Sequence, residues 1–237
     1  MQKKNIMKAK KLLLLMTVLS LFVASCSKDE YDESIRLDKG IYELYFEDEV
    51  QIEAKSSLDI TFHSENENIA KVSKDGIITG GIVGKTKIVL NNGNETKTIE
   101  VIINPRYNLY PNPMEKVVPG LTTEELMEIF GEESISSSSL RYLNYHPGAW
   151  LDVFLTVDKK NLQSLTVHVF DQTPDVVSEY LRERYILAYK KKYCDICLEE
   201  EAYKTEDNKY YIVFFPSNGS DQNTIGYGFT EGSGILW

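Results

Sequence analysis

The chain has few of the residues from which catalytic and metal sites are usually built. Its 237 residues include three histidines and three cysteines. The histidines, His63, His146 and His168, are scattered without metal-ligand spacing. No glycine-rich phosphate loop, serine nucleophile elbow or His-Glu-x-x-His motif occurs. We therefore expect no cofactor, no metal site and no enzymatic activity.

The chain also lacks an apolar run long enough to span a bilayer. Its main apolar run, Leu12–Val23, has 12 residues, whereas a helix crossing a hydrocarbon core needs about 20. Five lysines precede this run, and the small residues Ala24 and Ser25 follow it. A basic segment, an apolar segment and then small residues are typical of an export signal. We assign residues 1–26 to that signal.

The end of this segment, Val23-Ala24-Ser25-Cys26, resembles the lipobox of bacterial lipoproteins. The resemblance implies that Cys26 carries a lipid, becomes the mature N-terminus and attaches the protein to a membrane. Ser27-Lys28-Asp29-Glu30 further resembles the acidic signal that sends Bacteroidetes lipoproteins to the outer face of the outer membrane. The expected location is therefore the outer membrane, lipid-anchored and at the cell surface, with residues 27–34 as an acidic tether.

Basic residues are scarce after the signal. Five of the 26 basic residues precede Cys26 and all 36 acidic residues follow it, which leaves 21 basic residues and a net charge of −15. A chain with this charge is repelled by phosphate backbones. The charge therefore argues against nucleic acid as a partner.

The other two cysteines, Cys194 and Cys197, are separated by two residues. Disulfides persist outside the reducing cytosol, so a local disulfide is the favoured interpretation. Free structural thiols and a thioredoxin-like redox pair are the alternatives. The redox alternative is disfavoured because Glu199-Glu200-Glu201 follow the pair, and nearby negative charge raises a thiol pKa.

Residues 35–105 read as β-strands throughout. Short runs rich in Ile, Val, Tyr and Thr alternate with acidic, Asn-rich or Gly-rich connections. The expected strands are Ile41–Phe46, Val50–Ala54, Leu58–His63, Ile69–Val72, Ile77–Thr79, Thr86–Leu90 and Lys97–Ile103. Gly76 and Gly93 occupy the positions at which tight turns need positive φ. Seven strands at this spacing predict a small two-sheet sandwich.

This segment resembles the group 2 bacterial Ig-like domain. The matching residues are Ile60–Asn66, Ile69–Val72, Asp75–Thr79 and Gly84–Ile88. The chain departs from the family at Phe62, where the family usually carries tryptophan. The resemblance implies an Ig-like β-sandwich that serves as a spacer, as in surface adhesins.

Three prolines between Pro105 and Pro113 predict an extended connector, so we place a domain boundary there and assign residues 106–237 to a second domain. Thr122 and Glu125 predict a capping box at the start of one short helix. Thr173-Pro174 predicts the start of a second helix, whose apolar face continues to Ala188 and whose end lies near Lys190–Lys192. Ser134–Ser139 reads as a loop.

Strands are expected at Leu140–Tyr145, Trp150–Val157, Leu162–Phe170, Ala202–Thr205, Lys209–Phe215, Ile225–Thr230 and Ile235–Trp237. The fold class is therefore mainly β: an N-terminal Ig-like sandwich and a C-terminal α+β domain with two short helices on an antiparallel sheet. The second domain loosely resembles the uncharacterised domains that follow Ig-like modules in Bacteroidetes lipoproteins.

Several C-terminal residues are candidates for a function. Trp150, Tyr210 and Tyr211 are candidates for an aromatic platform that stacks on a sugar, although filling of the core is the favoured interpretation. Asp152 reads as an exposed strand residue, and His168 as a structural histidine with no visible partner. Glu47-Asp48-Glu49 reads as a solvated turn rather than a calcium loop.

Three functional hypotheses remain. The favoured one is a non-enzymatic surface lipoprotein for adhesion or ligand binding, with the membrane as partner through Cys26 and an extracellular protein or glycan as ligand. The second is a glycan-binding component of a polysaccharide-uptake system. The third, least favoured, is a C-terminal enzyme that uses Cys194 and Cys197.

Overall fold

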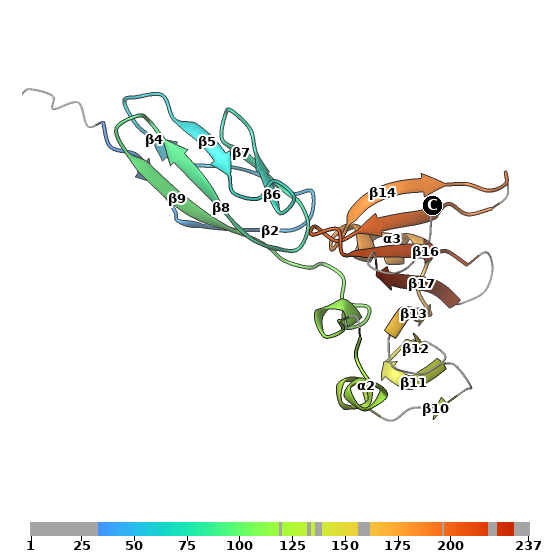
Figure 1. Ribbon diagram of the computed structural model, residues 1–237. Helices are drawn as coiled ribbons and strands as arrows, with labels where there is room; N and C mark the ends of the chain where they lie inside the picture. The colour runs from blue at the N-terminus through green and yellow to red at the C-terminus, as the bar shows by residue number, and fades with distance from the viewer. Residues whose placement is uncertain are drawn as a thin grey trace, which may run out of the picture.

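The computed structural model describes residues 33–118, 120–131, 134–135, 139–155, 162–195, 197–217 and 222–229. Within these ranges the chain forms two bodies joined by a connector (Figure 1). Each body has its own cluster of buried hydrophobic side chains. Cys26, the acidic tether through residue 32 and Trp237 lie outside the described residues, so lipidation of Cys26 stays a prediction.

The first body is a β-sandwich. Its strands are β1 (Arg36–Leu37), β2 (Ile41–Leu44), β3 (Glu49–Gln51), β4 (Ala54–Lys55), β5 (Thr61–Ser64), β6 (Ala70–Val72), β7 (Ile77–Gly80), β8 (Gly84–Asn91) and β9 (Thr96–Ile103). One sheet has the order β2-β9-β8-β5 and the other the order β3-β7-β6, while β1 pairs with β4. The first sheet is mixed, because β2 runs parallel to β9.

The sandwich core is built from alternate residues of its strands. Ile88 and Leu90 of β8 and Ile99 and Val101 of β9 are buried. Successive side chains of a strand point to opposite faces, so every second residue can enter the core. Phe62, at the position of the expected tryptophan, packs against this core. The predicted β-sandwich is confirmed.

Two glycine turns connect neighbouring strands of the sandwich. Gly76, between β6 and β7, has φ of 80°, and Gly93, between β8 and β9, has φ of 90°. Residues with a Cβ rarely adopt this conformation. Both turns agree with the positions predicted from the sequence.

The second body contains one antiparallel sheet. Its strands are β10 (Ser134–Ile135), β11 (Ser139–His146), β12 (Ala149–Leu155), β13 (Leu162–Phe170), β14 (Ile186–Lys191), β15 (Glu200–Lys204), β16 (Tyr210–Phe215) and β17 (Gln222–Phe229). The order is β10-β11-β12-β13-β17-β16-β15-β14. All neighbouring pairs are antiparallel.

Two α-helices cover one face of this sheet, and a short 3-10 helix, η1 (Pro113–Glu115), belongs to the connector. Val177 and Leu181 of α3 (Pro174–Arg182) share a buried cluster with Val167 of β13. Phe130 of α2 (Thr123–Phe130) contacts Tyr142 of β11, with ring centroids 5.3 Å apart. The predicted α+β arrangement is confirmed.

The helix starts follow the sequence signals. The Thr122 hydroxyl accepts a hydrogen bond from the Glu125 amide at 3.3 Å, and the Glu125 carboxylate accepts one from the Thr122 amide at 2.8 Å. Thr173 caps α3 in the same way through the Val176 amide. The reciprocal bonds in α2 form the predicted capping box.

The predicted length of the second helix is wrong. Helix α3 ends at Arg182, and the residues expected to continue it form strand β14, which pairs with β15. Lys190 therefore pairs with the Glu201 carboxylate instead of the end of a helix. The pairing of β14 with β15 outweighs the helical spacing of apolar residues in this segment, because helix propensity is only a weak preference.

Ser134–Ile135 forms β10 and Ser139 begins β11, so the segment predicted as a loop is partly strand. The expected strand Ile235–Trp237 lies outside the described residues. Within the described ranges, no helix has the length and apolar character needed to cross a membrane.

Candidate ligand-binding face and interdomain joint

The C-terminal sheet has a second face, opposite the helices, which we call the outer face. Register places alternate residues of each strand on it. Its central strands contribute Arg141, Trp150, Asp152, Phe154, Ser164, Thr166, His168, Phe170, Gln222, Thr224, Gly226, Gly228, Tyr211, Val213 and Phe215. Strands β15 and β14 add Glu200, Ala202, Lys204, Tyr189 and Lys191. This face carries most of the C-terminal residues singled out from the sequence.

Asp152 is the centre of a hydrogen-bonded network on the outer face. Arg141 donates to it from Nε at 2.6 Å and from Nη2 at 3.1 Å. His168 Nε2 lies 3.0 Å from Asp152 Oδ2. Asp152 is only 7% exposed, so the expectation of an exposed strand residue is wrong. His168 likewise has a partner, because the pairing of β12 with β13 brings it next to Asp152.

Both ring nitrogens of His168 are occupied. A carboxylate only accepts hydrogen bonds, so Nε2 carries the hydrogen and donates to Asp152. Nδ1 faces the Gln222 amide nitrogen at 2.6 Å and the Thr224 hydroxyl at 3.3 Å. Burial lowers the pKa of His168, although Asp152 acts in the opposite direction. His168 is thus a hydrogen-bonded structural histidine, and neighbouring side chains engage both of its ring nitrogens.

Trp150 is held on the outer face by packing. Its ring centroid lies 5.3 Å from that of His168 and 4.4 Å from that of Phe170. The Arg141 guanidinium lies 5.3 Å from the Trp150 ring centroid, within the range of cation–π attraction. The indole N–H is buried and makes no hydrogen bond within the described part of the chain. Trp150 therefore contributes ring surface here and no hydrogen bond.

Tyr211 shares the outer face with Trp150, but Tyr210 does not. The Tyr211 ring lies across Gly228, where an added Cβ would come within 2.1 Å of the ring. Tyr210 points to the opposite face and packs against the hydrophobic core. The three aromatic residues considered as candidates for one platform are therefore divided between the two faces of the sheet.

Glycoside hydrolysis needs two carboxylates across a cleft, and the acidic residues Glu200 and Glu201 lie on opposite faces of the sheet. Glu200 lies on the outer face, where it accepts hydrogen bonds from Tyr189 and Tyr193. Glu201 lies on the helix face, where Ser178 donates to it at 2.6 Å. Asp158 lies outside the described residues. Among the residues that the structure describes, no group of three or more His, Cys, Asp or Glu side chains is arranged to hold a metal ion.

A disulfide joins Cys194 and Cys197 in the connection between β14 and β15. The described part of this connection contains no helix. Low-pKa redox cysteines often sit at a helix N-terminus, which this pair lacks within the described residues. The bond closes the tip of the β14–β15 hairpin, as a structural brace would.

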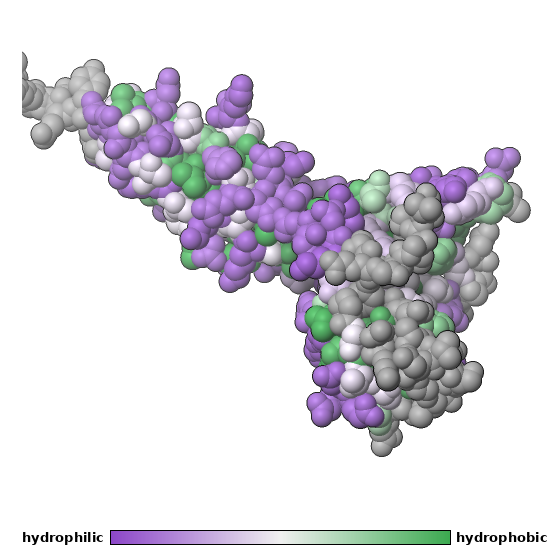
Figure 2. Space-filling view, viewed as in Figure 1, coloured by the Kyte–Doolittle hydropathy of each residue, from purple (hydrophilic) through white to green (hydrophobic). Residues whose placement is uncertain are grey.

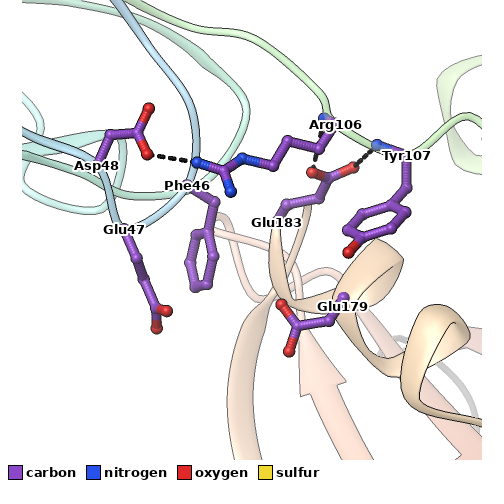
Figure 3. Close-up of a pocket in the computed structure, with 7 residues that line it drawn as sticks. All are labelled: Phe46, Glu47, Asp48, Arg106, Tyr107, Glu179 and Glu183. Carbon is purple, nitrogen blue, oxygen red and sulfur yellow. Dashed lines mark hydrogen bonds and ion pairs between the residues drawn. The ribbon is translucent and has the colours of Figure 1, made fainter.

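The two bodies meet at a joint centred on Glu183 (Figure 3). Its side chain accepts hydrogen bonds from the amides of Arg106 at 2.9 Å and Tyr107 at 3.0 Å, both in the connector. It also pairs with Arg184, which donates to the Tyr107 carbonyl at 2.6 Å. The Glu183 carbonyl accepts from the Val83 amide of the sandwich at 2.6 Å. One residue, 1% exposed, thus ties the connector and both bodies together.

Ion pairs surround this centre. Arg182 pairs with Glu47 at 3.1 Å, and Arg106 pairs with Asp48. These carboxylates belong to the sandwich turn that was expected to be solvated. Glu47 and Glu49 are indeed exposed, and the turn also borders the joint. A cavity of about 170 Å³ lies between the bodies. Its lining consists of Phe46, Glu47, Asp48, Arg106, Tyr107, Glu179 and Glu183.

Comparisons with known proteins leave the family open. Neither family models nor curated protein sequences match this chain. Among solved structures, domains 4–9 of the surface layer protein SbsC align with a TM-score of 0.28 at 11% identity, over 86% of this chain and 28% of that chain. An intimin mutant from EHEC O157:H7 aligns with a TM-score of 0.25 at 12% identity, over 82% of this chain and 96% of that chain.

SbsC domains 5–6 give a TM-score of 0.26 at 9% identity, over 85% of this chain and 98% of that chain. All three scores lie far below 0.5, so none of these likenesses carries an argument about fold or function. The architecture and the chemistry described above rest on the chain's own geometry.

Proposed function

We propose that this chain is a membrane-anchored, surface-exposed, non-enzymatic binding protein. In this proposal the lipid on Cys26 attaches it to the outer membrane, the sandwich is a spacer, and the C-terminal domain engages an extracellular ligand. The proposal rests above all on how the chain passes through the sandwich and on how the joint fixes the second body beyond it.

The sandwich separates the start of the described chain from the C-terminal domain. Glu33 is hydrogen-bonded to Asn92 and Asn94, which follow β8. Val83, immediately before β8, contacts Glu183 in the joint. The eight residues of β8 span about 26 Å. The chain thus enters the sandwich at one end and meets the second body at the other (Figure 1).

The surface of the sandwich supports its role as a spacer. In the view of Figure 2 the sandwich is covered mainly by hydrophilic side chains, with small scattered hydrophobic areas. Scattered apolar residues are normal on soluble surfaces, whereas large contiguous patches mark binding sites. The view shows no large patch over the sandwich, which is in keeping with ligand binding by the other body.

The anchor is tested by replacing Cys26. We expect wild-type protein to incorporate labelled fatty acid and to fractionate with the outer membrane. The Cys26→Ala variant should lose the label and appear in soluble fractions. A variant with Cys194→Ser and Cys197→Ser is the control, because it removes two cysteines without touching the lipobox. Membrane attachment of Cys26→Ala would contradict the proposal.

Surface display is tested by treating intact cells with protease. We expect the C-terminal domain to be cleaved in intact cells, while a cytoplasmic marker survives. Protection in intact cells combined with cleavage after lysis would contradict surface exposure.

The thiol–disulfide alternative makes a different prediction. A redox catalyst would reduce insulin or oxidise a reduced test protein in a manner that depends on Cys194 and Cys197. We expect no such activity from the exported protein. Activity that disappears in the double serine variant would instead support the enzyme.

A further inference from the structure

The outer face exposes aromatic rings on both sides of its centre. Phe154 on β12 is 41% exposed and Phe215 on β16 is 48% exposed. Trp150 and Tyr211 lie on the same two strands and are partly exposed. Neighbouring strands are about 4.8 Å apart, so β12 and β16, three steps apart in the sheet, are separated by about 14 Å. Ser164 and Gly228 lie between Phe154 and Tyr211, whereas His168 and Thr224 lie between Trp150 and Phe215.

The exposed charges of this face are positive. Among its described residues, the two acids, Asp152 and Glu200, are 7% and 8% exposed and are hydrogen-bonded to neighbouring side chains. The side chain of Arg141 is 48% exposed, and Lys191 and Lys204 are also exposed. The face therefore presents cations to solvent in a mature chain whose net charge is −15. This local reversal of charge favours an anionic ligand, because complementary charges speed encounter and select partners.

The chemistry of the face fits a sugar better than a lipid or a peptide. Aromatic rings offer flat apolar surfaces, and the hydroxyls of Ser164, Thr166 and Thr224 lie between them. A pyranose ring has the same combination of an apolar face and polar edges. Arg141 is packed against the Trp150 ring and held by Asp152, so a cation is fixed beside an aromatic surface.

We propose that the outer face binds an acidic glycan, a polymer whose sugars carry carboxylate or sulfate groups. The rings of Trp150, Phe154, Tyr211 and Phe215 supply stacking surface, and Arg141 and Lys204 receive the anionic groups. Arg141 and Lys204 lie on strands five steps apart, about 24 Å, which matches an oligosaccharide rather than one sugar. This inference rests on the proposed function, in which the C-terminal domain binds a ligand.

The experiment uses the full mature chain and measures its affinity for polygalacturonate, dextran sulfate and uncharged dextran. Polygalacturonate and dextran sulfate distinguish carboxylate from sulfate, and dextran tests the need for charge. A single-stranded DNA oligonucleotide is included because it also combines anions with stackable rings. We expect binding to at least one of the acidic glycans that weakens with added salt, and weaker binding to dextran and DNA.

Two variants locate the site. We expect Lys204→Gln to weaken binding roughly two- to fivefold, the effect of one exposed charge. Phe215→Ala should weaken it about fivefold through lost stacking. Both side chains are exposed, so neither change should unfold the domain. The matched controls lie on the sandwich. Lys85→Gln removes an exposed charge, and Ile41→Ala removes an exposed apolar side chain. Both control variants should bind the glycan like wild type.

The inference is overturned if dextran or DNA binds as well as both acidic glycans, if the Lys204 and Phe215 variants behave like the controls, or if no polymer binds. In each case the surface-display proposal is judged separately, by the lipidation and whole-cell protease experiments. A protein that is lipidated and cleaved on intact cells but binds no acidic glycan keeps the proposed function and loses this ligand.

Discussion

Asp152 and His168 show how much the environment of a single residue changes its interpretation. They are 16 positions apart in the chain, and their pairing depends on the register between β12 and β13. In the sequence Asp152 has the pattern of a solvent-facing strand residue. In the fold it is buried, and it is stabilised by charge-assisted hydrogen bonds from Arg141.

The lowered pKa of His168 predicts a loss of stability in acid. In the unfolded chain His168 binds a proton near pH 6.5, whereas in the folded chain burial keeps it from binding a proton until the pH is lower. The contribution of the neutral His168 ring to the unfolding free energy is therefore complete above about pH 6.5. It declines as the pH falls through the pKa of His168 in the folded chain. We expect His168→Gln to flatten the decline in unfolding free energy between pH 7.5 and 5.5, measured by urea denaturation. The matched control is His63→Gln, which should leave the decline unchanged because the side chain of His63 is exposed on β5 of the sandwich.

The glycines of β17 predict a contrast between neighbouring positions. A Cβ on Gly228 would lie 2.1 Å from the Tyr211 ring, whereas one on Gly226 would meet its nearest neighbour, the Val213 carbonyl, at 3.9 Å. We expect Gly228→Ala to displace Tyr211 and to cost about 1–3 kcal/mol. Gly226→Ala should change the unfolding free energy by less than about 1 kcal/mol. Thermal and urea unfolding measure both, and equal effects would contradict this account of Tyr211.

At the scale of secondary structure, local signals determined the starts of elements better than their ends. The helix starts at Thr122 and Thr173 and the turns at Gly76 and Gly93 depend on interactions within a few residues. The end of α3 depends on contacts with distant segments. Tyr185, just past its end, is buried and donates to Asn112 of the connector at 2.7 Å. The following residues pair with β15, which no local pattern reports.

The capping box predicts a measurable contribution to the short helix α2. Thr122→Ala removes the acceptor for the Glu125 amide, and the loss of such a cap costs about 1 kcal/mol. We expect a decrease of that size in unfolding free energy, measured by denaturant titration. Thr123→Ala is the control, because alanine is the stronger helix former and Thr123 makes no part of the box. A larger loss for the control would show that the cap does not stabilise this helix.

At the scale of the whole molecule, the joint sets whether the two bodies keep a fixed orientation or move relative to each other. The centre of the joint is a buried carboxylate that meets two connector amides and Arg184. The surrounding pairs, Arg182–Glu47 and Arg106–Asp48, are more exposed and therefore weaker. We infer that Glu183 fixes the orientation and that the outer pairs limit it further.

Replacing Glu183 should loosen the joint strongly. Glu183→Ala leaves Arg184 and two amides without their partner in a buried site, which typically costs about 3–5 kcal/mol. We expect lower stability of the C-terminal domain and a broader distribution of interdomain distances in small-angle X-ray scattering. Glu47→Gln, which removes an exposed partner of Arg182, should cost less than about 1 kcal/mol. Equal scattering profiles for wild type and Glu183→Ala would contradict a role of Glu183 in the orientation.

The sequence by itself determined the features that depend on short-range chemistry. These are the β character of residues 35–105, the two glycine turns, the helix caps and the proline-rich connector. Each depends on backbone conformation, capping or composition within a few residues, so neighbouring positions in the chain contain the information.

Only the tertiary structure decided which distant residues meet. It paired Asp152 with His168, placed Tyr210 and Tyr211 on opposite faces, ended α3 at Arg182 and turned Glu183 into the centre of a joint. The physical reason is that the register of a strand is set by how much apolar side-chain surface the whole sheet buries. That sum includes residues far apart in the chain. A shift of one residue in register would place a different set of side chains on the outer face.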